Sequence, residues 1–164
     1  MDMHKGKHKM NITRATAPTD VVRALIGELD EILSAEYPPE QRFGLAIDAI
    51  FAPHMRFFVA ELDGAPVGCG GVALLGDFAE VKRMYVRDAA RGKGVAQAIL
   101  ARLEAEARKA GLATLRLETG IVQHAAIRLY ERAGFKVCGA FGDYLTKPAS
   151  ALTTSVFYEK PLAS

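Results

Sequence analysis

The segment from Arg87 to Ala96, RDAARGKGVA, places two glycines and two cations between a strand-like apolar segment and a helix-like one. Gly92 and Gly94 allow the backbone to turn sharply and to approach a ligand closely. A helix that begins at this point offers unpaired N–H groups, and its dipole adds roughly half a positive charge at that end. With the side chains of Arg91 and Lys93, these features predict a local site for a phosphate or pyrophosphate.

Two familiar phosphate loops do not fit this segment. A Walker loop needs a hydroxyl residue for magnesium after its G-K pair, but Gly94 is followed by Val95. A dinucleotide fingerprint needs a third glycine where Gln97 stands. Taken alone, the loop could also be an ordinary solvated turn between a strand and a helix.

Composition narrows the class of protein. The chain has 164 residues, of which 50% are hydrophobic and 24% charged, which predicts one globular domain over residues 11–164 after a disordered tail at 1–10. The 21 basic and 19 acidic residues give a net charge of +2 and are interspersed. This argues against the broad basic face that nucleic-acid binding needs.

Cysteine usage and hydropathy indicate a reducing compartment. Cys69 and Cys138 have no metal-type spacing and lie in apolar runs, so we expect reduced core residues and no metal site. No apolar stretch reaches the roughly 20 residues of a membrane helix, and residues 1–10 do not resemble a signal peptide. The sequence therefore predicts a cytoplasmic protein without a membrane association.

Apolar periodicity and turn residues outline the elements. Helical spacing predicts helices from Asp20 to Tyr37, from Gln41 to Phe51, from Gly94 to Ala110 and over 123–133. Strand formers and turn pairs such as Asp63-Gly64 predict strands at 11–14, 56–62, 66–75, 79–86, 114–120, 135–140 and 155–162. The order predicts a mixed sheet, antiparallel at first, with a right-handed parallel crossover after Val86.

Two motifs resemble those of the GCN5-related N-acetyltransferases, the GNAT superfamily. Arg91-Gly92-Lys93-Gly94-Val95-Ala96 resembles the family's R/Q-x-x-G-x-G/A loop, and QHAAIRLYERAGF at 123–135 resembles its second signature. The resemblance covers residues 56–140. It implies a single-domain α/β (α+β) fold, with a mixed central sheet flanked by helices, antiparallel N-terminal strands and a parallel pair splayed at the cofactor site. In that family the loop opens the third helix.

The same resemblance implies how acetyl coenzyme A would bind. The loop amides of residues 91–96 would hold its pyrophosphate, and the pantetheine arm would follow the backbone of Met84, Tyr85 and Val86, where an N–H is the candidate oxyanion donor. Gln123 stands where the family often has asparagine, which makes its amide contact with the cofactor less certain. Neither a metal nor a covalent intermediate is required.

Catalytic roles follow from the resemblance as well. Tyr130 would lie near the sulfur, and a phenol of pKa about 10 can protonate a thiolate of pKa about 8.5. Glu80 matches a glutamate that some members use as general base. The structural alternatives are a packed tyrosine, and a Glu80 that pairs with Lys82 or Arg83. Glu118 is a second candidate base, and a chain of waters is the third candidate proton acceptor.

The expected reaction is acetyl transfer from acetyl-CoA to a primary amine of a small molecule. Protein or peptide amines, or a non-catalytic acyl-CoA-binding module, are the alternatives. The acceptor would contact residues 36–43 and 141–145, where Glu36, Glu40 and Asp143 suit a cationic amine and Arg42 suits a substrate carboxylate. These are equally well read as exposed loop residues. Family members often form homodimers, which we expect here without an assignable interface.

Overall fold

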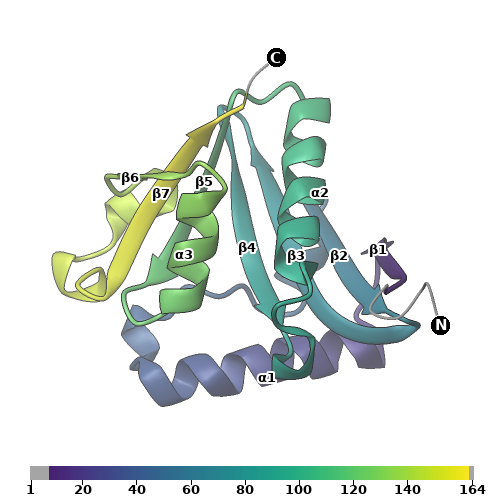
Figure 1. Cartoon of the computed structure of the whole chain (residues 1–164). Coiled ribbons are helices and arrows are strands. Elements are labelled where there is room, and N and C mark those ends of the chain that lie inside the picture. Colours follow the sequence, from purple (N-terminus) through teal and green to yellow (C-terminus); the bar gives the residue numbers. More distant parts are fainter. Residues whose placement is uncertain (1–7, 163–164) are drawn as a thin grey trace.

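The computed structural model describes residues 8–162 as one twisted sheet with helices on both faces (Figure 1). The strand order is β1-β2-β3-β4-β5-β7-β6. The strands are β1 (Met10–Ala15), β2 (Met55–Leu62), β3 (Ala65–Leu75), β4 (Phe78–Val86), β5 (Thr114–Gly120), β6 (Lys136–Cys138) and β7 (Ser155–Pro161). The α-helices are α1 (Asp20–Glu36), α2 (Val95–Lys109) and α3 (His124–Arg132). All neighbouring strands are antiparallel except β4 and β5, which are parallel, so the predicted mixed sheet is confirmed.

The two faces of the sheet carry separate cores. Phe58 packs with the buried stripe of α2, whereas its neighbour Phe57 packs with Val22, Leu25 and Ile26 of α1. Consecutive residues of a strand point to opposite faces, so β2 is hydrophobic on both sides. Thr19 caps α1 by accepting a hydrogen bond from the N–H of Val22 at 3.3 Å.

The predicted helix over 41–51 is wrong. This segment contains only two short 3₁₀ turns, η1 (Pro39–Gln41) and η2 (Ala49–Phe51), with irregular chain between them. Its apolar residues do not form one stripe, because Phe43 packs with the aromatic cluster of Phe141 and Tyr144 while Ile50 packs under α1. As a result, the loop at 91–94 opens the second α-helix of residues 8–162, and not the third.

The chain start is ordered earlier than predicted. Met10 already belongs to β1, and the N–H of Lys9 donates to Asp63 at 2.9 Å. The ring of His8 lies 2.8 Å from the other carboxylate oxygen of Asp63. The predicted disordered tail was therefore wrong for residues 8–10, and its remainder, residues 1–7, lies outside the described part of the chain.

Both cysteines are free, as expected. Cys69 is buried under α1, and burial raises the pKa of its thiol to about 12. Cys138 is only partly buried on the edge strand β6, where it packs against the aromatic cluster of Phe141, Tyr144 and Phe157. Over residues 8–162, no helix is long and apolar enough to cross a membrane, and no group of three or more His, Cys, Asp or Glu side chains could hold a metal ion.

A bulge in β4 sets up the site. Gly71 pairs with Lys82 and Cys69 pairs with Tyr85, so Arg83 and Met84 together lie opposite Gly70. Arg83 has a φ of 57°, which is uncommon for a residue with a side chain. The extra residue shifts the alternation of the strand, so the side chains after the bulge point to the opposite face from the one that regular alternation would give.

The parallel strands β4 and β5 pair over a very short length. Their register includes only Ala79 with Leu115 and Glu80 with Arg116. Beyond these pairs the two strands separate toward their carboxyl ends, and β5 continues beside β7. The predicted splayed pair is thus observed, with the separation beginning directly after Glu80.

Candidate active site

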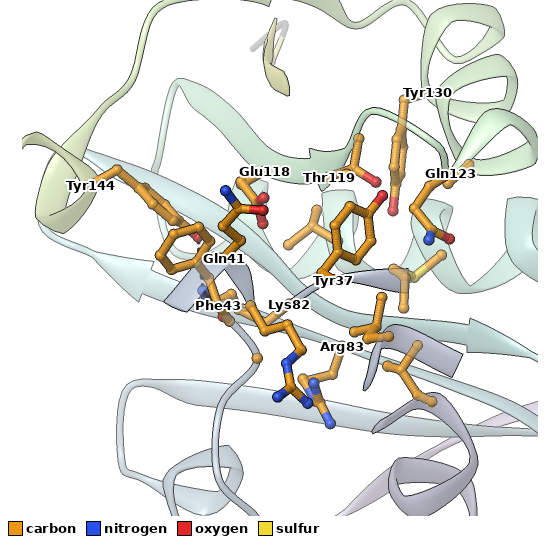
Figure 2. A pocket seen from close by; sticks show the side chains of 18 residues that line it. Tyr37, Gln41, Phe43, Lys82, Arg83, Glu118, Thr119, Gln123, Tyr130 and Tyr144 are labelled. Atoms are coloured by element: carbon orange, nitrogen blue, oxygen red, sulfur yellow. Dashed lines mark hydrogen bonds between the residues drawn. The ribbon is translucent and has the colours of Figure 1, made fainter. Parts of the chain in front are cut away.

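A cavity lies where β4 and β5 separate, beneath α3 and beside the end of α1 (Figure 2). Its lining combines the bulged part of β4, the carboxyl end of β5 and the irregular segment after α1. The side chains that matter below are Tyr37, Arg42, Phe43, Lys82, Arg83, Met84, Glu118, Gln123, Tyr130 and Tyr144. Most of these are polar although they are largely removed from solvent, which is unusual for a structural cavity.

Tyr130 enters the cavity from α3. The helix buries this residue to 5% exposure, and its ring packs edge-on against Phe135. Among the described residues its hydroxyl has no hydrogen-bond partner of good geometry, and Figure 2 shows that hydroxyl directed into the cavity near Tyr37. Burial, with a smaller contribution from the charge of Glu118, raises the pKa of Tyr130 above its ordinary range. The phenol is therefore protonated and able to donate a hydrogen bond.

Glu118 lies on β5 and lines the same cavity. One carboxylate oxygen accepts a hydrogen bond from the hydroxyl of Ser155 at 2.6 Å. Burial raises the pKa of this carboxyl, although the Ser155 hydrogen bond and the charge of Lys82 act in the opposite direction. No ion pair neutralises Glu118 among residues 8–162.

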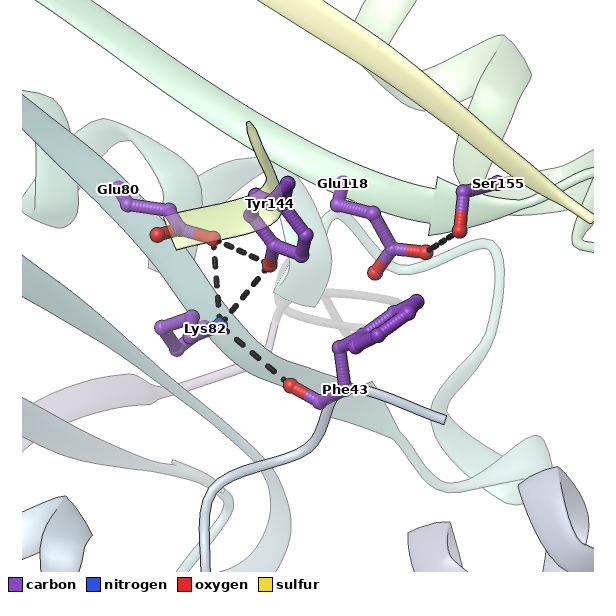
Figure 3. A network of polar contacts seen from close by, with 6 residues as sticks. All are labelled: Phe43, Glu80, Lys82, Glu118, Tyr144 and Ser155. Carbon is purple, nitrogen blue, oxygen red and sulfur yellow. Dashed lines mark hydrogen bonds and ion pairs between the residues drawn. The ribbon is translucent and has the colours of Figure 1, made fainter. Parts of the chain in front are cut away.

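Glu80 has a different environment (Figure 3). Its carboxylate lies 3.2 Å from the ammonium of Lys82 and accepts a hydrogen bond from the hydroxyl of Tyr144 at 2.7 Å. Lys82 also donates to Tyr144 at 3.1 Å and to the carbonyl oxygen of Phe43 at 3.4 Å. Of the two partners expected for Glu80 as a structural residue, Lys82 is the one observed, whereas Arg83 pairs with Asp30.

The three cofactor-binding residues predicted at the end of β4 direct their side chains to different places. Met84 lines the cavity. The side chain of Tyr85 points to α1, where its hydroxyl donates to Glu28 at 2.9 Å, and burial raises its pKa to about 12. Val86 packs against the α2 core. Any contact of Tyr85 or Val86 with a cofactor would therefore be made by backbone groups. A backbone contact of this kind was predicted from the sequence.

The loop at 91–96 does not line the cavity but lies at the same end of the sheet, before α2 (Figure 1). Gly92 and Gly94 have φ values of 76° and 80°. The first intrahelical bond is donated by Ala98 to Gly94, and no side chain of the described residues caps the helix. The N–H groups of Val95, Ala96 and Gln97 are therefore free to bind a ligand.

These features fit an anionic group. A side chain is absent at Gly92, where an added Cβ would meet nothing within 4 Å, so the loop backbone is open to a ligand. Lys93 is exposed, and Arg91 is 60% exposed in its side chain and pairs with Asp88 at 2.9 Å. A pyrophosphate would compete with a single exposed aspartate for Arg91, an exchange that costs little at the surface.

Gln123 precedes α3 and lines the cavity, but its amide is engaged. It donates to the carboxylate of Glu36 at the end of α1. The predicted contact of Gln123 with a cofactor stays a prediction and would require this bond to be shared or exchanged. His124, the first residue of α3, is exposed.

Sequence reasoning missed Tyr37 and the place of Arg83. Tyr37 was predicted as the end of a helix and as part of the acceptor segment 36–43, but without a role of its own. Its hydroxyl accepts from the N–H of Val122 at 3.2 Å and packs on Gly120, where a Cβ would lie 1.9 Å from it. A signal for the bulge was present in AEVKRMYV, because the alternation of apolar and polar residues breaks at the adjacent charges Lys82 and Arg83.

Comparisons with known proteins agree with this geometry. Residues 25–135 match the model of the acetyltransferase (GNAT) family. The chain is 43% identical to the "IAA acetyltransferase" of Azospirillum brasilense, over 93% of this chain and 98% of that protein. It is 32% identical to the uncharacterized N-acetyltransferase YsnE of Bacillus subtilis, over 81% of this chain and 90% of that one. A crystal structure from Klebsiella pneumoniae, provisionally named an acyl-CoA N-acyltransferase, superposes with a TM-score of 0.73 at 37% identity, over 94% and 98% of the two chains.

Proposed function

We propose that this chain, which belongs to the acetyltransferase (GNAT) family, moves the acetyl group of acetyl-CoA directly to a primary amine of a small molecule. One observation carries the proposal: a protonated phenol and a carboxylate without a cationic partner face one cavity at the splayed ends of two parallel strands. Direct transfer requires these two groups and correct positioning of the amine.

Acetyl-CoA, the acetyl donor of this family, supplies an activated thioester carbonyl when it is bound. The free N–H groups at the start of α2 and the cations Arg91 and Lys93 are suited to its pyrophosphate. Beyond Glu80, the backbone of β4 has no pairs with β5, so the N–H and C=O groups that face away from β3 are available to the pantetheine arm. A backbone N–H within Met84 to Val86 is the candidate donor to the developing oxyanion.

The acceptor amine has to lose a proton, because an alkyl ammonium of pKa near 10 is not a nucleophile. Of the two candidate carboxylates, the surroundings favour Glu118 over Glu80. A raised pKa makes Glu118 a stronger base than an ordinary carboxylate, and no cation blocks it. Glu80 is held by Lys82 and Tyr144 and would act as a second proton acceptor only after that network opened.

Tyr130 is proposed to stabilise the leaving thiolate. Tyr130 is buried and its hydroxyl is protonated, and no side chain of residues 8–162 forms a hydrogen bond with this hydroxyl. A donor without a competing partner is prepared to bind charge that develops during the reaction.

A small acceptor is supported by the way the cavity is enclosed. Phe43 and Tyr144, whose ring centroids lie 5.4 Å apart, flank one side of the cavity, and Tyr37 flanks the other (Figure 2). The name of the Azospirillum relative, an IAA acetyltransferase, also associates that protein with a small molecule.

Calorimetry and thiol release test the proposal together. Acetyl-CoA should bind the natural protein, and Arg91→Ala combined with Gly94→Asp should weaken binding at least about 30-fold by removing one cation and adding an anion. Arg56→Ala, which changes a partly buried arginine outside the site, should bind normally.

Release of free thiol across a panel of small amines and lysine peptides then identifies the acceptor class. Thiol release with small amines supports the proposal. Release with peptides alone would replace it by a protein acetyltransferase, and tight binding without turnover across the panel would leave an acyl-CoA-binding module.

A further inference from the structure

The bulge in β4 places an arginine in the cavity where regular alternation would not. Glu80, Lys82 and Tyr85 contact groups on the α1 side of the sheet, whereas Ala79, Val81, Met84 and Val86 pack with the α2 core. Without the extra residue, Arg83 would follow Lys82 onto the apolar face. With it, Arg83 reaches Asp30 of α1 and lines the cavity.

Arg83 is buried but incompletely bound. The residue is 7% exposed, and one terminal nitrogen donates to Asp30 at 2.5 Å. Its Nε is buried and has no hydrogen-bond partner among residues 8–162. A guanidinium in this situation normally has all its donors engaged, so a free buried donor is costly unless a ligand occupies it.

A second arginine, which is only partly buried, also has an unpartnered Nε. Arg42 lines the same cavity, and its Nε is likewise buried without a partner. It donates to the hydroxyl of Ser34 but forms no ion pair within the described part of the chain. The guanidinium of Arg83 lies against Gly44, two residues after Arg42, where a Cβ would come within 1.9 Å of it. Because Gly44 has no side chain, the guanidinium of Arg83 can lie beside the segment that carries Arg42.

The charges at this end of the cavity do not balance. Among the described residues, Arg83 pairs with Asp30, whose side chain is 58% exposed, and Arg42 forms no ion pair. Figure 2 shows Arg83 on the side of the cavity away from Tyr130. Two forked guanidinium groups with free donors match the two oxygens of a carboxylate.

We propose that the acceptor carries a carboxylate in addition to its amine, and that Arg83 and Arg42 bind this carboxylate. The inference rests on the proposed function and names its substrate class: an amino acid or close analogue with an apolar side chain. Leu29, Leu33 and Phe43, which also line the cavity, suit that side chain. The amine then points toward Glu118 and Tyr130.

Matched pairs of amines that differ only in the carboxylate test this directly. The pairs are leucine with 3-methylbutylamine, methionine with 3-(methylthio)propylamine, and phenylalanine with 2-phenylethylamine. For at least one pair, kcat/KM from thiol release should be about 10- to 100-fold higher for the amino acid. In Arg42→Gln, and in Arg83→Lys, which keeps the charge near Asp30 but loses the fork, the preference should fall below about threefold. Arg56→Gln should retain it.

A binding measurement separates this inference from the proposed function. In the presence of coenzyme A, 4-methylpentanoate, which is leucine without its amine, should bind the natural protein and Arg56→Gln but bind Arg42→Gln at least about tenfold more weakly. Such binding supports the carboxylate site even if none of the amines is acetylated, an outcome that would count against the proposed function. Turnover of amines with no preference for the carboxylate, or equal binding of 4-methylpentanoate to natural protein and Arg42→Gln, would overturn the inference and leave the proposed function standing.

Discussion

Glu80 and Glu118 lie on neighbouring parallel strands and face the same region, but only Glu80 has a cationic partner (Figure 3). Lys82 and Tyr144 surround the carboxylate of Glu80, whereas Glu118 has the hydroxyl of Ser155 alone. Where the strands still pair, at Glu80, the charge is compensated inside the protein. Where they have separated, at Glu118, it is not.

In the proposed mechanism, this difference allows one sheet to supply both a structural and a reactive carboxylate. A compensated buried charge holds elements together, here β4, the segment at Phe43 and the turn η4 (Gly142–Thr146) that carries Tyr144. An uncompensated carboxylate has a raised pKa and binds protons more strongly. The predictions below separate these two roles.

The largest effect should come from Glu118→Gln. Amide replaces carboxylate at the same size, so the fold is kept while the base is lost, and kcat should fall by about 10²- to 10⁴-fold. Steady-state kinetics with the best amine of the panel measures this, with Glu61→Gln on β2 as a control outside the cavity. A decrease in kcat of less than about threefold would show that Glu118 is not the general base.

Glu80→Gln should act on stability first. Lys82 would remain largely buried without a counter-charge, and the free energy of unfolding should fall by about 2–4 kcal/mol. Urea denaturation measures this loss. The double variant Glu80→Gln with Lys82→Met should recover most of it, because it removes the stranded ammonium. If the single variant were as stable as the natural protein, Glu80 would not have the structural role assigned to it.

The two buried tyrosines should also differ. Tyr130→Phe keeps the ring contact with Phe135 and removes a hydroxyl that no described side chain binds, so kcat should fall about 10- to 100-fold while the melting temperature changes little. Tyr144→Phe removes the hydrogen bond to Glu80 and should lower stability by about 1 kcal/mol with a smaller effect on kcat. A large loss of kcat in Tyr144→Phe, with a loss of stability alone in Tyr130→Phe, would contradict these roles.

The smallest effect is a pH dependence of stability. The pKa of Glu118 is raised in the folded protein, so this carboxyl favours folding at low pH, and that contribution is lost as the pH rises through the folded-state pKa. Glu118→Gln lacks this titration. Its stability relative to the natural protein should therefore increase between pH 4 and pH 8 in thermal unfolding scans. A difference independent of pH would contradict the raised pKa.

Much of the fold and part of the site could be predicted from the sequence. The strands, the start of α2 and the position of Tyr130 follow from periodicity, glycines and motif spacing, all of which are local. The helix expected over 41–51 failed because Phe43 and Ile50 belong to different clusters, which periodicity cannot distinguish. Lys82 was predicted as a partner of Glu80. The contacts of Tyr144 with Glu80 and of Arg83 with Asp30 depend on a one-residue bulge or on pairs more than fifty positions apart in the chain, so only the structure could reveal them.

The pH dependence of kcat at saturating amine, for the natural protein, Glu118→Gln and Glu80→Gln, tests the central claim most directly. Ionisation of the amine is common to all three, so differences between them report the protein. Glu118→Gln should lose an acid limb whose midpoint in the natural protein lies above the ordinary carboxyl value of 4.5, while Glu80→Gln keeps it. Loss of that limb in Glu80→Gln, with its retention in Glu118→Gln, would contradict the account and make Glu80 the base.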